Sequence, residues 1–459
     1  MKFRGLSLFV ICLMASGSLL LRLHSQALRN APVLAERPPM GWNSWDSFGL
    51  TINEQQFRDN IDVLATELKP FGWQYAVIDE GWFLRHPTVR LTPETLDYEL
   101  DPTGRYIPVP DRFPSAIEHG KNEGFTALGN YVHSRGLKFG IHIVRGIPRE
   151  SVAQNLPVAG SSFHAQDVAD TSDACPWDPT NWGVRDTPAG QAWYNSLLAQ
   201  YANWGVDYLK VDCIADHPYK PAEIRMIHRA ILKTGRPIIL SLSPGPTSPG
   251  IAKEIIPYAQ MWRISDDIWD YWTNPRPWPR SVRNQFELAA AWAPYAAPGR
   301  WPDADMLPLG YLGPHPGDGE ARTSRLTHDE QQTMLTLWAI ARSPLILGAN
   351  LTRLDEDSKK LITNRDVIEL DQYAHDQRQV SSEGNTIAWT SMGKGNIRYL
   401  ALFNLNDTEK KINRSFDFYN LPAKTYRARE LWSQTDYDTS ASVNVTLRPH
   451  ACVLLELNP

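Results

Sequence analysis

This 459-residue chain has no large excess of charge of either sign, and it contains few cysteines. Lys and Arg number 46 against 51 Asp and Glu, which gives a formal net charge of −5. That balance argues against a nucleic-acid partner, and an apolar content of 42% argues against a disordered chain. The composition is that of a soluble globular protein.

Long apolar runs are absent after the N-terminus. The chain starts with the basic residues Lys2 and Arg4, continues with a largely apolar run over 6–21, and reaches a small-x-small site at 25–27. This order is typical of a cleaved secretory signal, here residues 1–27. A membrane anchor is the alternative, but the run is short of a full span. We therefore expect a secreted or periplasmic protein with no stable membrane insertion.

Cysteine is too rare for a disulfide framework. One of the four cysteines, Cys12, lies in the signal, which leaves Cys175, Cys213 and Cys452. An exported protein can oxidise one pair, and Cys175 with Cys213 is the better candidate because Cys452 sits in an apolar terminal strand. Three free buried thiols are the alternative. The absence of a C-x-x-C spacing argues against a structural zinc site.

Motifs for several kinds of chemistry are also missing. The sequence contains no H-E-x-x-H, no Walker loop, no dinucleotide glycine fingerprint and no G-x-S-x-G elbow. These absences argue against a zinc peptidase, a nucleotide-binding enzyme and a serine hydrolase of the common types. We expect neither a metal nor a cofactor.

Alternating β and α patterns fill residues 36–372. Thr51 with Glu54, and Thr327 with Glu330, are spaced as helix capping boxes. Eight strands are expected, at 40–42, 75–78, 139–141, 208–211, 237–242, 261–264, around 301, and at 344–347. Eight such repeats predict a (β/α)8 TIM barrel, in the α/β class. After residue 375 polar and apolar residues alternate, which predicts a C-terminal antiparallel β-sandwich domain over 380–459.

Acidic residues follow several predicted strands, where such barrels keep their active sites. Lys210 and Asp212 point to the same side of one strand, and Arg263 precedes Asp266 and Asp267 on another. Two carboxylates across a barrel mouth are what glycoside hydrolysis requires. The alternative is that these acids cap helices or form salt bridges at the rim.

Tryptophan is unusually frequent, with 17 residues against 17 Tyr and 14 Phe. Its flat apolar face and single N–H suit stacking on sugar rings. A set of core anchors is the alternative explanation for most of them.

The chain resembles glycoside hydrolase family 27, the α-galactosidase and α-N-acetylgalactosaminidase family, from Pro38 to the C-terminus. The motifs that carry the resemblance are PMGWNSW at 39–45, IDEGW at 78–82, GRYIP at 104–108, RFP at 112–114, HSRGLKFGI at 133–141, KVD at 210–212, R-x-x-x-D at 263–267, DADML at 303–307, LWAI at 337–340 and VLLEL at 453–457.

The resemblance implies a retaining mechanism with two carboxylates. Asp212 would be the nucleophile and Asp267 the general acid and then the base. Asp267 would need a raised pKa to carry its proton. Asp266 is the alternative acid, and the spacing from Arg263 selects Asp267.

The resemblance also implies the residues that bind sugar. Trp45 would form the apolar wall of the pocket. Asp79, Lys210 and Arg263 would bind hydroxyls, and Asp303 lies in a segment near the pocket. Trp262, Trp269 and Trp272 are candidates for the aglycone side, with rim packing as the alternative.

Three departures from the family pattern bear on the sugar. Glu80 replaces an Asp, and its extra methylene would crowd C6 of galactose and favour a pentopyranose. His142 replaces a Tyr, and Ser243 stands where α-galactosidases have a Glu. We therefore expect a hydrolase of terminal α-D-galactosyl residues on an oligosaccharide or polysaccharide. The alternatives are α-N-acetylgalactosaminides, β-L-arabinopyranosides, α-glucan ends, or a non-catalytic sugar-binding protein. The sequence leaves the oligomeric state open.

Overall fold

The computed structural model describes residues 33–87, 92, 96–274, 278–422 and 425–459. The predicted signal at 1–27 lies outside the described residues. Within them no helix is long and apolar enough to cross a membrane.

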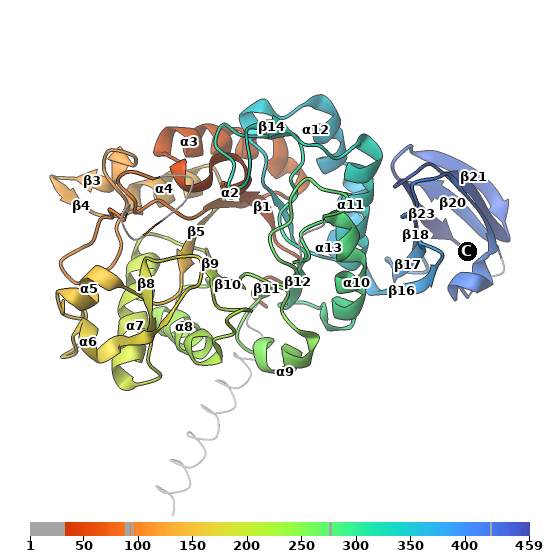
Figure 1. Ribbon diagram of the computed structural model, residues 1–459. Coiled ribbons are helices and arrows are strands. Elements are labelled where there is room, and N and C mark those ends of the chain that lie inside the picture. Colours follow the sequence, from red (N-terminus) through yellow and green to blue (C-terminus); the bar gives the residue numbers. More distant parts are fainter. Residues whose placement is uncertain (1–32, 88–91, 93–95, 275–277, 423–424) are drawn as a thin grey trace, which may run out of the picture.

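Eight parallel strands form the first domain (Figure 1). They are β1 (Met40–Asn43), β2 (Tyr75–Ile78), β5 (Lys138–Val144), β9 (Tyr208–Asp212), β10 (Ile239–Leu242), β11 (Met261–Arg263), β12 (Trp301–Asp303) and β15 (Leu345–Leu347). Each strand pairs in parallel with its neighbour from β15 through β1 to β12. Leu307, just after β12, bridges Leu347 of β15 and closes the ring. The predicted barrel is confirmed.

Helices surround the strands (Figure 1). They are α3 (Glu54–Val63), α4 (Thr126–Ser134), α7 (Pro188–Asn203), α8 (Pro221–Thr234), α9 (Ala252–Ile255), α10 (Val282–Trp292), α11 (His328–Ala341), α12 (Glu356–Ile362) and α13 (Arg365–Tyr373). The predicted box of Thr327 and Glu330 caps α11. At α3 the prediction was wrong. Asn53 caps that helix together with Gln56, because the chain turns through a 3₁₀ helix at Gly49–Thr51 first.

An excursion between β5 and α7 forms a small antiparallel sheet beside the barrel. Its elements are β6 (Ile147–Pro148), α5 (Arg149–Ala153), α6 (Ala165–Val168), β7 (Ala169–Ala174) and β8 (Asn181–Val184). Short hairpins lie elsewhere on the rim: β3 (Ile117–Glu118) with β4 (Lys121–Asn122), and β13 (Tyr311–Leu312) with β14 (Arg322–Thr323). The turn from β7 to β8 brings Cys175, Trp177 and Asp178 toward the barrel axis, as their contacts below show.

The C-terminal domain contains two antiparallel sheets. Its strands are β16 (His375–Glu383), β17 (Thr386–Met392), β18 (Arg398–Asn404), β19 (Lys410–Ser415), β20 (Tyr426–Glu430), β21 (Thr435–Ser440), β22 (Ser442–Leu447) and β23 (Cys452–Asn458). A six-stranded sheet runs β16-β17-β18-β23-β20-β21, and β19 pairs with β22. Strands β16 and β21 are mostly solvent-facing and polar, so their sequences do not show the alternation of polar and apolar residues.

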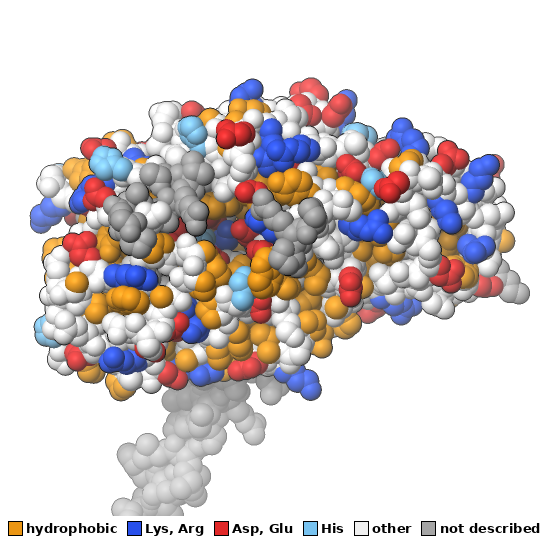
Figure 2. Space-filling model, viewed as in Figure 1, with side chains coloured by type: hydrophobic (Ala, Val, Ile, Leu, Met, Phe, Trp, Pro, Cys, Tyr) orange, Lys and Arg blue, Asp and Glu red, His pale blue; other side chains and the backbone are white. Residues whose placement is uncertain are grey.

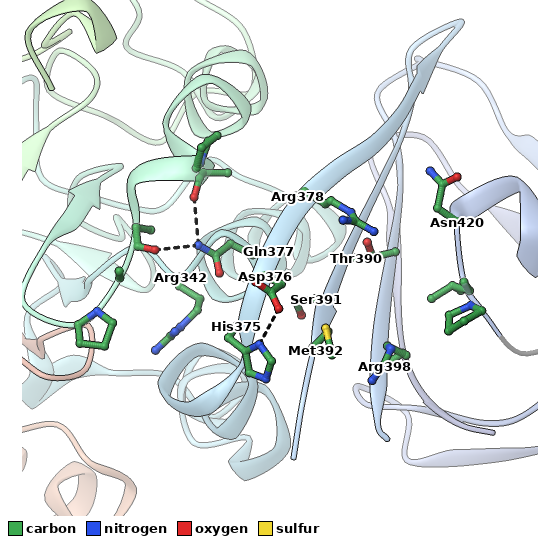
Figure 3. A pocket seen from close by; sticks show the side chains of 17 residues that line it. Arg342, His375, Asp376, Gln377, Arg378, Thr390, Ser391, Met392, Arg398 and Asn420 are labelled. Atoms are coloured by element: carbon green, nitrogen blue, oxygen red, sulfur yellow. Dashed lines mark hydrogen bonds and ion pairs between the residues drawn. The ribbon is translucent and has the colours of Figure 1, made fainter. Parts of the chain in front are cut away.

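The C-terminal domain packs beside α10 and α11 (Figure 1). The ring of Trp272, in the loop after β11, stacks on His450 at 4.2 Å. His450 in turn contacts Glu330 of α11 at 2.7 Å. Gln377 of β16 donates to the carbonyl oxygens of Ala293 and Ala296, drawn as dashed lines in Figure 3. The loop after β11 therefore rests on the second domain.

Candidate active site

Every second side chain of a barrel strand faces the barrel interior. Near the strand starts these positions are apolar, and they form one buried cluster of Val77, Tyr208, Ile239, Met261 and Trp301. Two residues further along the same strands the inward positions are polar, namely Asp79, Lys210, Ser241, Arg263 and Asp303. The interior thus changes from apolar to charged toward the carboxyl ends, which is where the sequence predicted a site.

A cavity of about 200 Å³ opens above this polar layer. It is lined by Trp45, Leu50, Asp79, Glu80, His142, Trp177, Asp178, Lys210, Asp212, Ser243 and Asp267. Figure 2 shows a hollow near the middle of the barrel with acidic and basic side chains inside it. Of the ten predicted catalytic and sugar-binding residues, only Arg263 and Asp303 do not line the cavity; both are buried.

A larger cavity, of about 650 Å³, lies where the barrel meets the C-terminal domain (Figure 3). Its lining includes Arg342, Arg378 and Arg398 but neither of the predicted catalytic acids. Size alone would select this cavity. The converging carboxylates select the smaller one, because hydrolysis of a glycoside needs acids rather than room.

Asp79 lies at the centre of the charged layer and is 2% exposed. Its Oδ2 accepts hydrogen bonds from Asn43 at 2.6 Å and from Nζ of Lys210 at 2.9 Å. Burial raises the pKa of Asp79, but His142, Lys210 and the backbone N–H of Glu80 outweigh burial and hold that pKa well below its usual range. Asp79 is therefore a fixed anion, able to accept hydrogen bonds from sugar hydroxyls.

Asp212 ends β9 and has two hydrogen-bond donors. The hydroxyl of Ser243 donates to Oδ1 at 2.9 Å, and Nε1 of Trp177 donates to Oδ2 at 3.0 Å. Each oxygen is thus held by one donor, which fixes the plane of the carboxylate. Ser243 therefore contacts Asp212 directly.

Asp267 faces the cavity with 39% of its side chain exposed. Partial burial raises its pKa, but Arg263, 3.2 Å away, and Lys210 outweigh burial and lower it. The raised pKa expected for a general acid is therefore not found at Asp267. Asp266 has a raised pKa because of burial and of Asp267, but it does not line the cavity. Geometry favours Asp267 over Asp266.

Arg263 is the buried cation beneath these acids. Its guanidinium pairs with Asp305 at 2.7 Å and with Asp267 at 3.2 Å. Burial raises the pKa of Asp305 to about 7 despite this pair. Asp303 accepts a hydrogen bond from the backbone N–H of Asp305 at 2.9 Å. Arg263 and Asp303 therefore support the floor of the cavity.

Glu80 and Asp178 form a carboxyl pair on one wall. Burial, the charge of Asp178 and a hydrogen bond to Asp178 raise the pKa of Glu80 well above its usual range. Oδ2 of Asp178 is buried and accepts no hydrogen bond from a donor among the described residues. Glu80 in its protonated form can donate a hydrogen bond to Asp178.

His142 lies on β5 with its Nε2 3.9 Å from Oδ1 of Asp79. Burial lowers the pKa of His142, and the nearby carboxylate of Asp79 opposes this shift. A Tyr at this position would offer one hydroxyl, whereas a neutral imidazole offers one donor and one acceptor.

Trp45 forms the apolar wall, as the resemblance implied for its place in the pocket. A Cβ added to Gly317 would lie 2.3 Å from its indole ring, so only glycine lets that loop pack on Trp45. Gly317 also donates its backbone N–H to the carbonyl oxygen of Trp45 at 3.1 Å. The loop of Gly317 therefore packs against the indole of Trp45 and holds it in place.

A disulfide joins Cys175 to Cys213, which confirms the preferred pairing. Cys213 directly follows Asp212, and Cys175 precedes Trp177 and Asp178. The bond ties the loop that carries these two cavity residues to the end of β9. Cys452 is a free, buried thiol.

Three charged or aromatic residues in or near the site were not predicted as such. Trp177 and Asp178 lie in an irregular loop, and only their closeness to Cys175 could have indicated them. Asp46 is 1% exposed, and neither of its oxygens accepts a hydrogen bond from a described residue. Burial and the charge of Asp305 raise the pKa of Asp46 well above its usual range.

Trp262 and Trp269, suggested for the aglycone side, are buried core residues.

No group of three His, Cys, Asp or Glu side chains suited to a metal ion occurs in the described part of the chain. Two carboxylates in different surroundings, Asp212 and Asp267, line the cavity instead. Buried cations lie beneath them. A barrel of this kind with an acid pair at its carboxyl-terminal face defines a glycoside hydrolase.

The comparisons with known proteins identify the family. The model described as alpha galactosidase A matches residues 182–373, and that described as the alpha galactosidase C-terminal beta sandwich domain matches 383–457. The chain belongs to glycoside hydrolase family 27, and it is a hydrolase. The resemblance of the sequence motifs is confirmed.

Three similar proteins are named for three different sugars. A family 27 β-L-arabinopyranosidase from Geobacillus stearothermophilus is 40% identical, with a TM-score of 0.88 and coverage of 93% of this chain and 97% of that one. An alpha-galactosidase from Cyamopsis tetragonoloba is 29% identical and spans 93% of this chain and 87% of its own length. An alpha-N-acetylgalactosaminidase from Gallus gallus is 27% identical and spans 77% of this chain and 75% of its own length.

Proposed function

We propose that the protein is a retaining exo-glycoside hydrolase of galacto-configured pyranosides that prefers terminal β-L-arabinopyranosyl over α-D-galactosyl residues. The observation that carries the reaction type is the placement of Asp212 and Asp267 on one cavity above a layer of buried cations. The observation that favours the pentose is Glu80.

In the first step a carboxylate oxygen of Asp212 bonds to the anomeric carbon as the glycosidic C–O bond breaks. Asp267 gives its proton to the leaving oxygen. In the second step Asp267, now a carboxylate, removes a proton from water, whose oxygen displaces Asp212. The lowered pKa of Asp267 suits the second step. A bound sugar would remove water from its exposed side chain and raise that pKa for the first step.

Glu80 decides the sugar in this proposal. Its side chain is one methylene longer than Asp and carries the carboxyl toward Asp178, into space that the C6 hydroxymethyl of galactose would need. β-L-Arabinopyranose has the same ring configuration and no C6. The 40% identical relative is a β-L-arabinopyranosidase, which points the same way.

A panel of nitrophenyl glycosides tests the sugar. We expect a higher kcat/KM for the β-L-arabinopyranoside than for the α-D-galactoside, the α-N-acetylgalactosaminide and the α-glucoside. Glu80→Asp should shift the arabinoside-to-galactoside ratio toward galactose by about 10- to 100-fold, the effect of one methylene in a pocket. Glu80→Gln is the matched control, because it keeps the length and should keep the preference. An unchanged ratio in Glu80→Asp would refute the role of Glu80, and binding without turnover of any glycoside would favour a sugar-binding protein.

A separate experiment tests the catalytic roles. Asp212→Ala should abolish turnover, and azide should restore it by forming a glycosyl azide of inverted configuration. Asp267→Asn should lose kcat/KM toward sugar leaving groups but keep much of its kcat/KM toward dinitrophenyl glycosides, which leave without a proton in the first step. Asp266→Asn should show no such dependence on the leaving group. If Asp266→Asn shows it instead, the acid is Asp266.

We propose in addition that the protein is exported and that residues 1–27 are removed, because the N-terminal sequence has the order of a secretory signal. N-terminal sequencing of the protein recovered outside the cytoplasm should begin at Leu28. A first residue of Met1 would contradict this.

A further inference from the structure

Three aromatic rings from three loops form a continuous surface beside the catalytic cavity. Trp177 lies between β7 and β8, His217 follows β9, and Trp278 follows β11. The rings of Trp177 and His217 are 5.4 Å apart, and those of His217 and Trp278 stack at 4.5 Å with an interplanar angle of 19°. We call these three residues the aromatic rim.

The aromatic rim is exposed where most tryptophans of the barrel are not. Trp177 is 42% and Trp278 44% exposed, whereas Trp262 and Trp269 are fully buried. An indole that stays this exposed gains less from burial than a core indole, so two of them in ring contact through one histidine indicate a surface suited to a ligand. Figure 2 shows hydrophobic side chains gathered beside the central hollow.

The aromatic rim begins at the reacting carboxylate. Trp177 lines the cavity, and its Nε1 donates to Oδ2 of Asp212 at 3.0 Å. Trp278 belongs to the same loop as Asp267, and Arg280 of that loop donates to the carbonyl oxygen of Asp267 at 3.2 Å. The surface therefore starts at Asp212, and its outer ring belongs to the loop that carries Asp267.

Building on the proposed function, we propose that the aromatic rim is the aglycone subsite and that it binds a neutral pyranose ring next to the hydrolysed bond. An indole packs its face on the C–H groups of a pyranose, and the exposed outer ring leaves room for further sugar units. The ring of His217 is paired with Asp216 at 2.7 Å, and Trp177 donates to Asp212 at 3.0 Å. These carboxylates disfavour an acidic sugar at this position.

The aromatic rim also replaces the earlier expectation for the aglycone side. Trp262 lies in β11 and Trp269 in the loop after it, and both indoles are buried in the core. Trp272 is directed to the C-terminal domain, where it stacks on His450. Of the tryptophans between β11 and α10 that the structure describes, Trp278 is the exposed one.

The experiment compares two substrates that share one glycon: the glycosyl fluoride, which has no aglycone ring, and a disaccharide that links the glycon to a neutral hexose. The readout is the ratio of kcat/KM for the disaccharide to kcat/KM for the fluoride. Trp278→Ala should lower this ratio about tenfold, the factor expected for one lost aromatic contact. Trp278→Phe keeps a flat ring and should restore most of it.

Tyr437→Ala is the matched control, because Tyr437 is an equally exposed aromatic residue in β21, 44% exposed, on the C-terminal domain. It should leave the ratio unchanged. An unchanged ratio in Trp278→Ala overturns the subsite, and so does an equal loss of both activities, which would indicate a structural role. Failure of the wild-type protein to hydrolyse any glycosyl fluoride of the panel sugars would overturn the proposed function itself, and this outcome is distinct from both.

Discussion

The disulfide between Cys175 and Cys213 should contribute both to stability and to activity. The bond closes a loop of 38 residues. A cross-link of that span lowers the entropy of the unfolded chain by an amount worth about 4 kcal/mol at 25 °C. The variant Cys175→Ala/Cys213→Ala should therefore unfold about 3 to 4 kcal/mol more easily than the wild type, because relaxation around the lost sulfur atoms offsets little of the effect.

The loss of activity should exceed what unfolding explains. In folded protein without the bond, the loop with Trp177 and Asp178 is no longer tied to the strand end that holds Asp212. Glu80 then loses its hydrogen bond to Asp178, and kcat/KM should fall about tenfold or more at temperatures where the variant is fully folded, as for loosened positioning of a catalytic group.

Urea denaturation followed by tryptophan fluorescence and circular dichroism measures the first effect, and nitrophenyl glycoside kinetics measure the second. Cys452→Ala is the matched control, because it removes a buried thiol without cutting a cross-link. The reasoning is refuted if the double variant loses no more stability than Cys452→Ala, or if its folded fraction is fully active.

Three other changes test the charged layer. Lys210→Met leaves Asp79 as an unpaired buried anion, so unfolding in urea should become easier by about 3 to 5 kcal/mol, and a wild-type midpoint would contradict the pair. The raised pKa of Asp46 means that the folded state holds this proton more tightly than the unfolded state, so its contribution to stability is full below about pH 4 and is lost as the pH rises. Asp46→Asn should therefore flatten the fall in urea midpoint between pH 5 and 8, whereas parallel curves would show that Asp46 is ionised. Gly317→Ala should displace Trp45 and raise KM more than it lowers kcat, and unchanged KM would show that the loop yields instead.

The sequence was sufficient for the parts of the site that lie on regular strands. A period of two places Asp79, Lys210 and Asp212 inward as soon as the strands are known, and the structure brings all three to one cavity. The same reasoning could not reach Trp177 and Asp178, because no periodicity governs an irregular loop.

Local sequence rules also competed with one another. Thr51 and Glu54 match the spacing of a capping box, yet Asn53 caps α3, because the chain is still turning at Thr51. The direction of a carboxyl pKa could not be predicted from the residue type alone. Asp267 needed a raised pKa by its role, but Arg263 lies only 3.2 Å away and lowers it.

The contact of Trp272 with His450 makes the boundary between the two domains a poor place to cut the chain. His450 is held by Glu330 on one ring nitrogen and by Asp407 on the other, and its face supports the ring of Trp272. Trp272 lies five residues after Asp267, so the C-terminal domain supports the loop that carries Asp267. A sandwich transplanted from a relative would have to bring a flat ring at the place of His450, or the loop that carries Asp267 would lose this support.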